Sequence, residues 1–205
     1  MKETIQTYLN PAGAQAFIAK EIPHDADRST QAWQLLDGLD LHGKIVLDMG
    51  CGFGRDTAEI RRRGAACWGI DVSPHLLQEA RLRYGGSQWH EADVLDLHNP
   101  PIQPVDLIWS YAFLVHVPHT TVEALLTRWA GWLKPGGRIV IGTKVGSGQK
   151  VVNNLGQDLP RTMVYHSLAD IQAILERCGG KVEVAHQDAA TAYGEALLLL
   201  RTCHP

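Results

Sequence analysis

The sequence predicts an α/β fold: a doubly wound, Rossmann-like sheet of about seven strands, with helices on both faces and an N-terminal helical cap. Short, almost continuously apolar runs alternate with helical patterns, which is typical of parallel strands covered on both sides. A turn with three glycines follows the first run, where such sheets bind ligands. The chain has 205 residues and is 45% hydrophobic, so we expect one domain over residues 1–205.

The elements are expected in a regular order along the chain. Helices before residue 40 precede the first strand, and the polar stretch 146–161 is long enough to be a lid. A helix and two strands then close the chain, in residues 167–205. The expected strands are 44–48, 66–71, 88–91, 105–110, 138–143, 181–186 and 193–201.

Helix starts are marked by polar residues that can cap the backbone. Ser73 and Ser167 stand directly before amphipathic runs. Thr120 with Glu123 predicts a capping box at the start of a further helix, whose apolar positions include Leu125 and Trp129. The sequence "LKPGG" is expected to end that helix before the fifth strand.

Composition excludes several classes of protein. The net charge of -3 argues against a nucleic-acid partner held by charge. The four cysteines form no C-x-x-C pair, which favours a reducing compartment. No run approaches the ~20 apolar residues of a membrane span, and the start has no signal-peptide centre. We therefore expect a cytoplasmic protein without a membrane partner.

The stretch "VLDMGCGFGRD" carries the strongest functional signal. Gly50, Gly52 and Gly54 let the backbone approach a ligand. Their spacing departs from the dinucleotide fingerprint, because Arg55 stands where the third glycine belongs. Asp48 would repel a pyrophosphate and attract a ligand with an ammonium and a sulfonium. A cationic nucleoside is favoured, and Asp71 at the end of the second strand is placed to bind its ribose hydroxyls.

Five stretches in this order resemble the class I S-adenosylmethionine-dependent methyltransferases. They are "VLDMGCGFG", "GIDVSP", "HEADVLDL", "VDLIWSYAFLVHV" and "LKPGGRIVI". The resemblance is strong over residues 40–145 and is greatest to small bacterial members of the ubiquinone-biosynthesis and tellurite-resistance types, which act mainly on small molecules. It implies the sheet order 3-2-1-4-5-7-6 with the last strand antiparallel, and a cofactor-binding core at residues 41–145.

The resemblance also implies which residues hold S-adenosylmethionine. Asp48 and the glycine backbone would bind its methionine end, Asp71 the ribose, and Asp93 the adenine amine. The residues implied in cofactor binding are Asp48, Gly50, Cys51, Gly52, Gly54, Arg55, Asp71, Val72, Asp93, Val94 and Ser110. Two alternatives remain open, because Asp93 could cap residues 94–97 and Arg55 could pair with Glu59 instead of the methionine carboxylate.

The catalytic residues are less visible in the sequence. Methyl transfer can proceed largely by alignment, and a base is needed only when the acceptor must lose a proton. Candidates are His166 and Tyr165 at the end of a lid segment 146–166, His116 after the fourth strand, and Tyr111 beside the sulfonium. His116 stands in an otherwise apolar run, which favours a packed, hydrogen-bonded histidine over a base. No metal site is expected, since His116 and His119 lack a third ligand.

The predicted function is methyl transfer to a small molecule, with the acceptor atom (N, O, S or C) left open. "WSYA" after the fourth strand departs from the stretch typical of nucleic-acid amino-methyltransferases. The alternative keeps the cofactor but releases methylthioadenosine, by cyclisation, lyase chemistry or aminocarboxypropyl transfer. The protein is expected to be a monomer or a homodimer.

Overall fold

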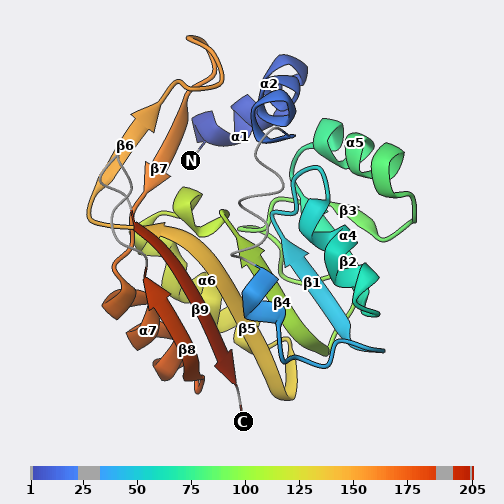
Figure 1. Ribbon diagram of the computed structural model, residues 1–205. Helices are drawn as coiled ribbons and strands as arrows, with labels where there is room; N and C mark the ends of the chain where they lie inside the picture. The colour runs from blue at the N-terminus through green and yellow to red at the C-terminus, as the bar shows by residue number, and fades with distance from the viewer. Residues whose placement is uncertain (1, 23–32, 188–195, 204) are drawn as a thin grey trace.

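The computed structural model describes residues 2–22, 33–187, 196–203 and 205, and its centre is a seven-stranded sheet (Figure 1). The strands in spatial order are β3 (Trp89–Glu91), β2 (Ala66–Asp71), β1 (Ile45–Met49), β4 (Val105–Tyr111), β5 (Leu133–Val145), β9 (Ala196–Cys203) and β8 (Lys181–Gln187). The first five are parallel, and β9 runs antiparallel to both β5 and β8. The predicted fold and strand order are therefore confirmed, although the predicted start of the last strand lies outside the described residues.

Helices cover both faces of the sheet. The helices are α4 (Arg55–Arg62), α5 (Pro74–Tyr84), α6 (His119–Ala130) and α7 (Leu168–Arg177), with short 3-10 turns η2 (Gln34–Leu36) and η3 (Leu114–His116). On one face, Ile108 and Ile141 pack with Trp129 of α6 and Leu175 of α7. The other face packs against α4 and η2. Burial on both sides explains why the strands read as continuous apolar runs.

The helix starts confirm two of the three predicted caps. The Ser73 hydroxyl accepts a hydrogen bond from the Leu76 amide at 3.3 Å, and the Ser167 hydroxyl accepts one from the Asp170 amide at 3.1 Å. The capping box at Thr120 is wrong, because α6 already begins at His119 with Pro118 at its N-cap. The prediction that "LKPGG" ends this helix is also wrong. The helix α6 ends at Ala130, and the "LKPGG" residues belong to β5, where Leu133 pairs with Val105.

The N-terminal helices α1 (Lys2–Leu9) and α2 (Pro11–Glu21) lie above the carboxyl ends of the strands, beside a separate hairpin. Its strands are β6 (Gln149–Val152) and β7 (Arg161–Val164). The segment expected to be a polar lid loop is thus largely a β-hairpin. Thr7 Oγ1 donates to the Pro160 carbonyl at 2.6 Å, and the Thr162 amide donates to Thr4 Oγ1 at 2.9 Å. We call α1, α2 and this hairpin the cap.

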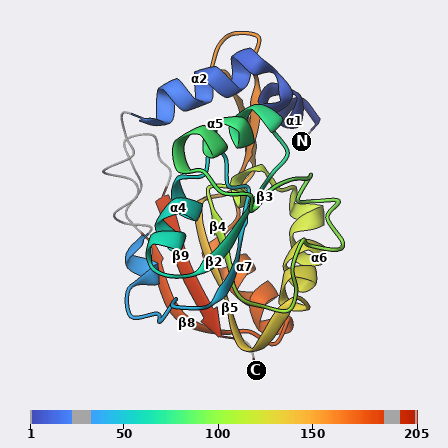
Figure 2. The same cartoon turned by 90° about the vertical axis from the view of Figure 1, so that its right-hand side faces the viewer.

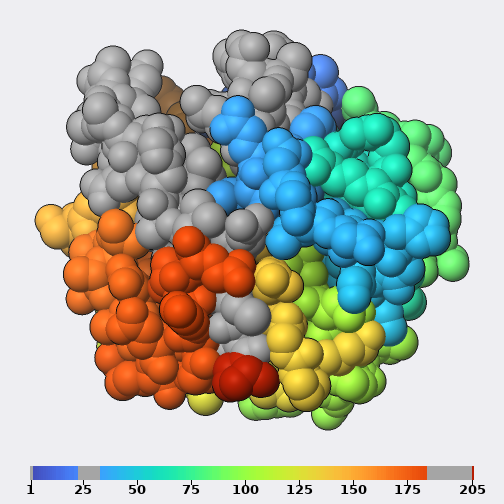
Figure 3. Space-filling view, turned by 60° about the horizontal axis from the view of Figure 1, so that its bottom comes forward, coloured from blue at the N-terminus to red at the C-terminus, as the bar shows by residue number. Residues whose placement is uncertain are grey.

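The top and the lower face of the molecule are seen in two further views. In Figure 2, α2 lies across the top of the molecule, next to α5. Figure 3 shows the face seen from below, with the light-blue segment before β1 on one side and the orange C-terminal segment on the other. Among the described residues, no helix is long and apolar enough to cross a membrane.

Candidate active site

The glycine turn joins β1 to α4 with a backbone that only glycine adopts readily. Gly50, Gly52 and Gly54 all have positive φ, at +76°, +56° and +86°. A Cβ on Gly50 would lie 2.6 Å from the Phe113 ring, and one on Gly54 would lie 2.5 Å from Trp89. A Cβ on Gly52 would meet only Phe17, at 3.6 Å. Gly50 and Gly54 are therefore held by packing, while Gly52 has more space beside it.

Asp71 connects this turn to the end of β2. Its Oδ2 accepts from the Gly52 amide at 2.9 Å, and its Oδ1 accepts from the Ser73 amide at 2.9 Å. Burial raises the pKa of Asp71, although the amides of Ser73, Gly52 and Val72 favour the ionised form. A carboxylate can accept about four hydrogen bonds, so this one keeps capacity for a ligand hydroxyl.

Asp48 is a buried carboxylate on the α4 side of β1. It accepts from Thr57 Oγ1 at 2.5 Å and is 2% exposed. Burial raises its pKa to about 8, and the negative charge of Asp56 acts in the same direction. A positive group brought next to Asp48 would favour its ionised form.

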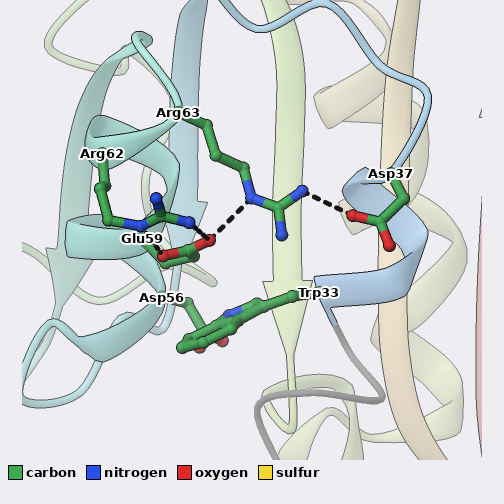
Figure 4. A network of polar contacts seen from close by, with 6 residues as sticks. All are labelled: Trp33, Asp37, Asp56, Glu59, Arg62 and Arg63. Carbon is green, nitrogen blue, oxygen red and sulfur yellow. Dashed lines mark hydrogen bonds and ion pairs between the residues drawn. The ribbon is translucent and has the colours of Figure 1, made fainter.

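Asp56 is enclosed by the hydrogen-bond donors of three side chains. Trp33 Nε1 donates to one of its oxygens at 3.2 Å, and Figure 4 shows these two residues side by side. Trp109 Nε1 donates to the other oxygen at 3.1 Å, and Arg55 Nε donates at 2.9 Å. This places the Arg55 side chain between Asp56 and the Tyr111 ring, which lies 5.8 Å from the guanidinium carbon. Neither Asp56 nor Thr57 was singled out from the sequence.

The pairing of Arg55 with Glu59, one of the two alternatives left open above, is not formed. Glu59 instead forms ion pairs with Arg62 at 2.7 Å and Arg63 at 2.8 Å. Arg63 also pairs with Asp37 at 2.9 Å, which ties the segment before β1 to α4. Glu59 is therefore paired with arginines at the C-terminal end of α4, while Arg55 at the N-terminal end pairs with Asp56.

The end of β4 presents different chemistry on its two faces. Within the residues that the structure describes, the buried Ser110 hydroxyl has no hydrogen-bond partner, and neither has that of Thr143 on the adjacent strand β5. Tyr111 points to the other face, where its ring stacks on Trp109 at a centroid distance of 6.4 Å. Buried polar groups normally have partners, so the two orphaned hydroxyls can bond to a ligand at the strand ends.

The adenine contacts expected near β3 are arranged less favourably. Asp93 Oδ1 accepts from the Leu95 amide at 3.0 Å, which is the local capping alternative. Val94 is 2% exposed and packs in the main core, while Val72 is half-buried. Burial raises the pKa of the Cys51 thiol well above its usual range, so this cysteine is not activated as a nucleophile.

His116 belongs to a chain of polar contacts beneath the cap. Its Nδ1 lies 3.0 Å from the Thr162 carbonyl, and its Nε2 lies 3.4 Å from the Tyr8 hydroxyl. Burial lowers the pKa of His116 to about 4. A carbonyl only accepts, so Nδ1 carries the hydrogen and Nε2 presents its lone pair toward Tyr8.

The two catalytic candidates that follow β7, Tyr165 and His166, are enclosed. His166 is 1% exposed, with its Nε2 3.0 Å from the Val117 carbonyl and its ring packed edge-on against His119 at 4.6 Å. Burial lowers the pKa of His166, while contacts with the Val117 and Leu114 backbone oppose the shift. Tyr165 packs in a small cluster with Val115 and Met163. The structure therefore brings His116, but not His166, to the cap residues.

Arg161 is the main residue of this site that the sequence analysis did not single out. It is 5% exposed and donates from Nη1 to the Tyr8 hydroxyl at 2.7 Å and from Nη2 to Asn154 Oδ1 at 2.6 Å. Its contact with Tyr8 joins residues 153 positions apart. No local pattern in the sequence predicts such a contact.

The fold and the position of the site together define the class of protein. This is a doubly wound α/β protein whose glycine turn and two buried aspartates lie at the carboxyl ends of β1 and β2, the usual ligand position in such sheets. Residues 46–137 match the family model described as a methyltransferase domain.

Curated relatives and a solved structure agree with the match to the methyltransferase domain. A trans-aconitate 2-methyltransferase from Methylobacterium nodulans is 41% identical over 118 residues, covering 56% of this chain and 44% of the relative. A ubiquinone biosynthesis O-methyltransferase from Xanthomonas oryzae pv. oryzae is 36% identical over 109 residues, covering 51% of this chain and 45% of the relative. This chain thus spans less than half the length of these relatives. The structure of a DhpI–SAM–HEP complex superposes with a TM-score of 0.77 at 19% identity, covering 100% of this chain and 97% of that one, and so shows the shared fold.

Proposed function

We propose that this protein transfers the methyl group of S-adenosylmethionine to a small-molecule acceptor. The observation that carries the proposal is the joining of the glycine turn to the end of β2, where the Gly52 amide donates to Asp71. This contact fixes a carboxylate beside the half-buried backbone of Gly52, at the strand ends where a nucleoside ligand binds in such sheets. The methyltransferase domain at residues 46–137 and the named relatives support the same chemistry.

The residues present fit this cofactor at both of its ends. Asp71 would accept from the ribose hydroxyls, and Asp48 would face the methionine ammonium, whose charge favours the ionised carboxylate. The orphaned Ser110 hydroxyl is a buried donor at the end of β4. The adenine contacts of Asp93, Val72 and Val94 remain predictions. When bound, the cofactor supplies a methyl group on a sulfonium with a neutral leaving group.

The acceptor would approach beneath the cap, where His116 replaces His166 as the favoured proton acceptor. The Nε2 of His116 directs its lone pair at the Tyr8 hydroxyl, because Nδ1 donates to the Thr162 carbonyl. Tyr8 lies between this nitrogen and Arg161 and could pass a proton from the acceptor to His116. His166 has its Nε2 turned to a backbone carbonyl, so we assign it a structural role.

A product assay tests the proposal directly. The protein is incubated with S-adenosylmethionine and a panel of amines, thiols, phenols and carboxylates, including trans-aconitate, and the nucleoside product is identified. S-adenosylhomocysteine indicates methyl transfer, whereas methylthioadenosine would contradict it and indicate the alternative chemistry. A cytoplasmic location and a monomeric or homodimeric state remain predictions.

Cofactor binding is tested with one matched pair of variants. Asp71→Asn should weaken S-adenosylhomocysteine binding by about 10- to 100-fold, because charge-assisted hydrogen bonds to the ribose are lost. Asp96→Asn makes the same change at an exposed residue and should leave the affinity unchanged. Calorimetry measures both, and equal affinities for the two variants would remove Asp71 from the cofactor site.

A further inference from the structure

Arg161 is a buried cation without a described counter-ion. Its side chain donates to a phenol hydroxyl and an amide oxygen, and its Nε–H is buried with no hydrogen-bond partner among the described residues. Across the described residues, no aspartate or glutamate forms an ion pair with it. A guanidinium keeps its charge under all ordinary conditions, and a buried charge is stable only when it is paired or well hydrogen-bonded.

The surroundings of Arg161 compensate its charge only in part. The rings of Tyr8 and Phe17 lie 5.8 and 5.9 Å from its guanidinium carbon. Aromatic faces attract cations weakly compared with a carboxylate. The site therefore combines positive charge, an orphaned N–H donor and an apolar wall, and this combination selects a planar or tetrahedral anion.

The position of Arg161 relates this anion to the acceptor and not to the cofactor. Its polar partners are Tyr8 on α1 and Asn154 in the hairpin, and both belong to the cap. Through the Tyr8 hydroxyl, Arg161 connects to His116 after β4. None of its described hydrogen bonds goes to the glycine turn, Asp48 or Asp71.

We propose that Arg161 binds an anionic group, a carboxylate or a phosphonate, of the methyl acceptor, and so selects acidic small molecules. This inference rests on the proposed methyl transfer, because it assigns the acceptor side of the same site. The Nε–H and one Nη–H would donate in parallel to two oxygens of the anion. Tyr8 holds the other side of the guanidinium in place.

The first test observes the orphaned N–H itself. Protein labelled with ¹⁵N at arginine Nε is titrated with acetate, with methylphosphonate and with neutral acetamide, both with and without S-adenosylhomocysteine. The Arg161 resonance, assigned by its loss in Arg161→Lys, should shift and saturate with at least one of the two anions and not with acetamide. Which anion binds more tightly identifies the acceptor group.

Two variants on the hairpin serve as controls for this titration. Lys150→Met removes an exposed cation from β6 and should leave the shift unchanged. Asn154→Asp places a carboxylate against the guanidinium and should weaken anion binding by about 10- to 100-fold, because the charge is already paired. An Arg161 resonance that responds to neither anion, or equally to acetamide, would overturn the proposal.

The second test separates this inference from the proposed function. Arg161→Met and wild type are compared by calorimetry with S-adenosylhomocysteine and with methylthioadenosine, which lacks the amino-acid carboxylate. We expect both affinities to be unchanged in the variant. A selective loss for S-adenosylhomocysteine would show that Arg161 holds the cofactor carboxylate and would refute the acceptor assignment. If wild type binds neither nucleoside, the proposed function itself fails.

Discussion

At the scale of single residues, Asp48 and Asp56 form an unusual pair. Both carboxylates are buried next to β1, and the charge of Asp56 adds to burial in raising the pKa of Asp48 to about 8. Asp56 accepts from two indoles and Arg55, whereas the one side-chain donor to Asp48 in the described part of the chain is the Thr57 hydroxyl. Asp48 is therefore the member of the pair whose ionisation state a cationic ligand can change.

The first prediction concerns the pH dependence of binding. Because the folded pKa of Asp48 is raised to about 8, a ligand ammonium that favours the carboxylate must displace a proton at lower pH. The affinity for S-adenosylhomocysteine should rise with pH from about 6 to 8, by up to about tenfold per unit. Calorimetry in buffers of different ionisation enthalpy measures the released proton.

Methylthioadenosine is the matched control, since it lacks the ammonium. Its affinity should change little over the same range, and Asp48→Asn should remove the slope for S-adenosylhomocysteine. Identical slopes for the two nucleosides would show that Asp48 does not face the methionine end.

The second prediction concerns His116. His116→Asn keeps a donor for the Thr162 carbonyl but removes Nε2, so turnover should fall by about 10²- to 10⁴-fold if the acceptor loses a proton. Cofactor affinity should not change. The control His42→Asn alters an exposed histidine, and full turnover in His116→Asn would indicate catalysis by alignment alone.

At the scale of elements, the turn between β1 and α4 has two kinds of glycine. Gly50 and Gly54 combine positive φ with close packing against aromatic rings, whereas Gly52 has positive φ with ordinary space around its Cα. The sequence predicts that this turn approaches a ligand, but it does not show which glycine is fixed by packing. Phe113 and Trp89 are distant along the chain, and their contacts depend on the complete sheet.

The third prediction follows from this difference. Gly50→Ala should destabilise the protein by about 2–4 kcal/mol, because strain at φ +76° adds to overlap with the Phe113 ring. Gly52→Ala should cost only about 1–2 kcal/mol, from backbone strain, yet weaken cofactor binding more than its stability change accounts for. Denaturant unfolding and calorimetry measure the two effects, and equal destabilisation would contradict the packing argument.

Elements with strong local signals were predicted well, and those set by long-range contacts were not. Ser73 and Ser167 cap their helices because a serine there bonds to its own turn. At Thr120 the local signal was equally good, but α6 starts one residue earlier, at His119, after Pro118. The hairpin of β6 and β7 has little apolar alternation, and its contacts with α1 could not be read from sequence.

At the scale of the whole molecule, the cap joins the N-terminal helices α1 and α2 to a hairpin far along the chain, at residues 149–164. The alternation of strands and helices predicts a doubly wound sheet, the resemblance implies its strand order, and both are confirmed. The chain of contacts from Asn154 through Arg161 and Tyr8 to His116 spans α1, η3 and the hairpin. Such a chain exists only after the fold is complete, so no sequence period indicates it.

The fourth prediction concerns stability at acid pH. Burial lowers the pKa of His116 to about 4 from an ordinary 6.5, so the unfolded state binds a proton before the folded state does. Stability from the neutral imidazole is full above pH 6.5 and is lost as the pH falls toward 4, by about 3 kcal/mol. His116→Gln should lack this loss.

The pH dependence of the unfolding free energy must be compared between the variant and wild type. The reason is that Asp48 stabilises the folded state at low pH, whereas His116 destabilises it. The raised pKa of Asp48 favours the folded state as the pH falls from about 8 toward 4. The difference in unfolding free energy between wild type and His116→Gln, measured in urea at pH 7 and pH 4, isolates the histidine. A difference that does not change with pH would place His116 in a solvated environment.

The two indoles bonded to Asp56 give the protein a built-in optical probe. Trp109 is 1% exposed, and its Nε1 donates to the carboxylate whose charge acts on Asp48. A change in the charge of Asp48 alters the electric field at this indole, and with it the tryptophan emission. Ligand binding can therefore be followed without a label, and Trp109→Phe identifies the part of the signal that comes from the site.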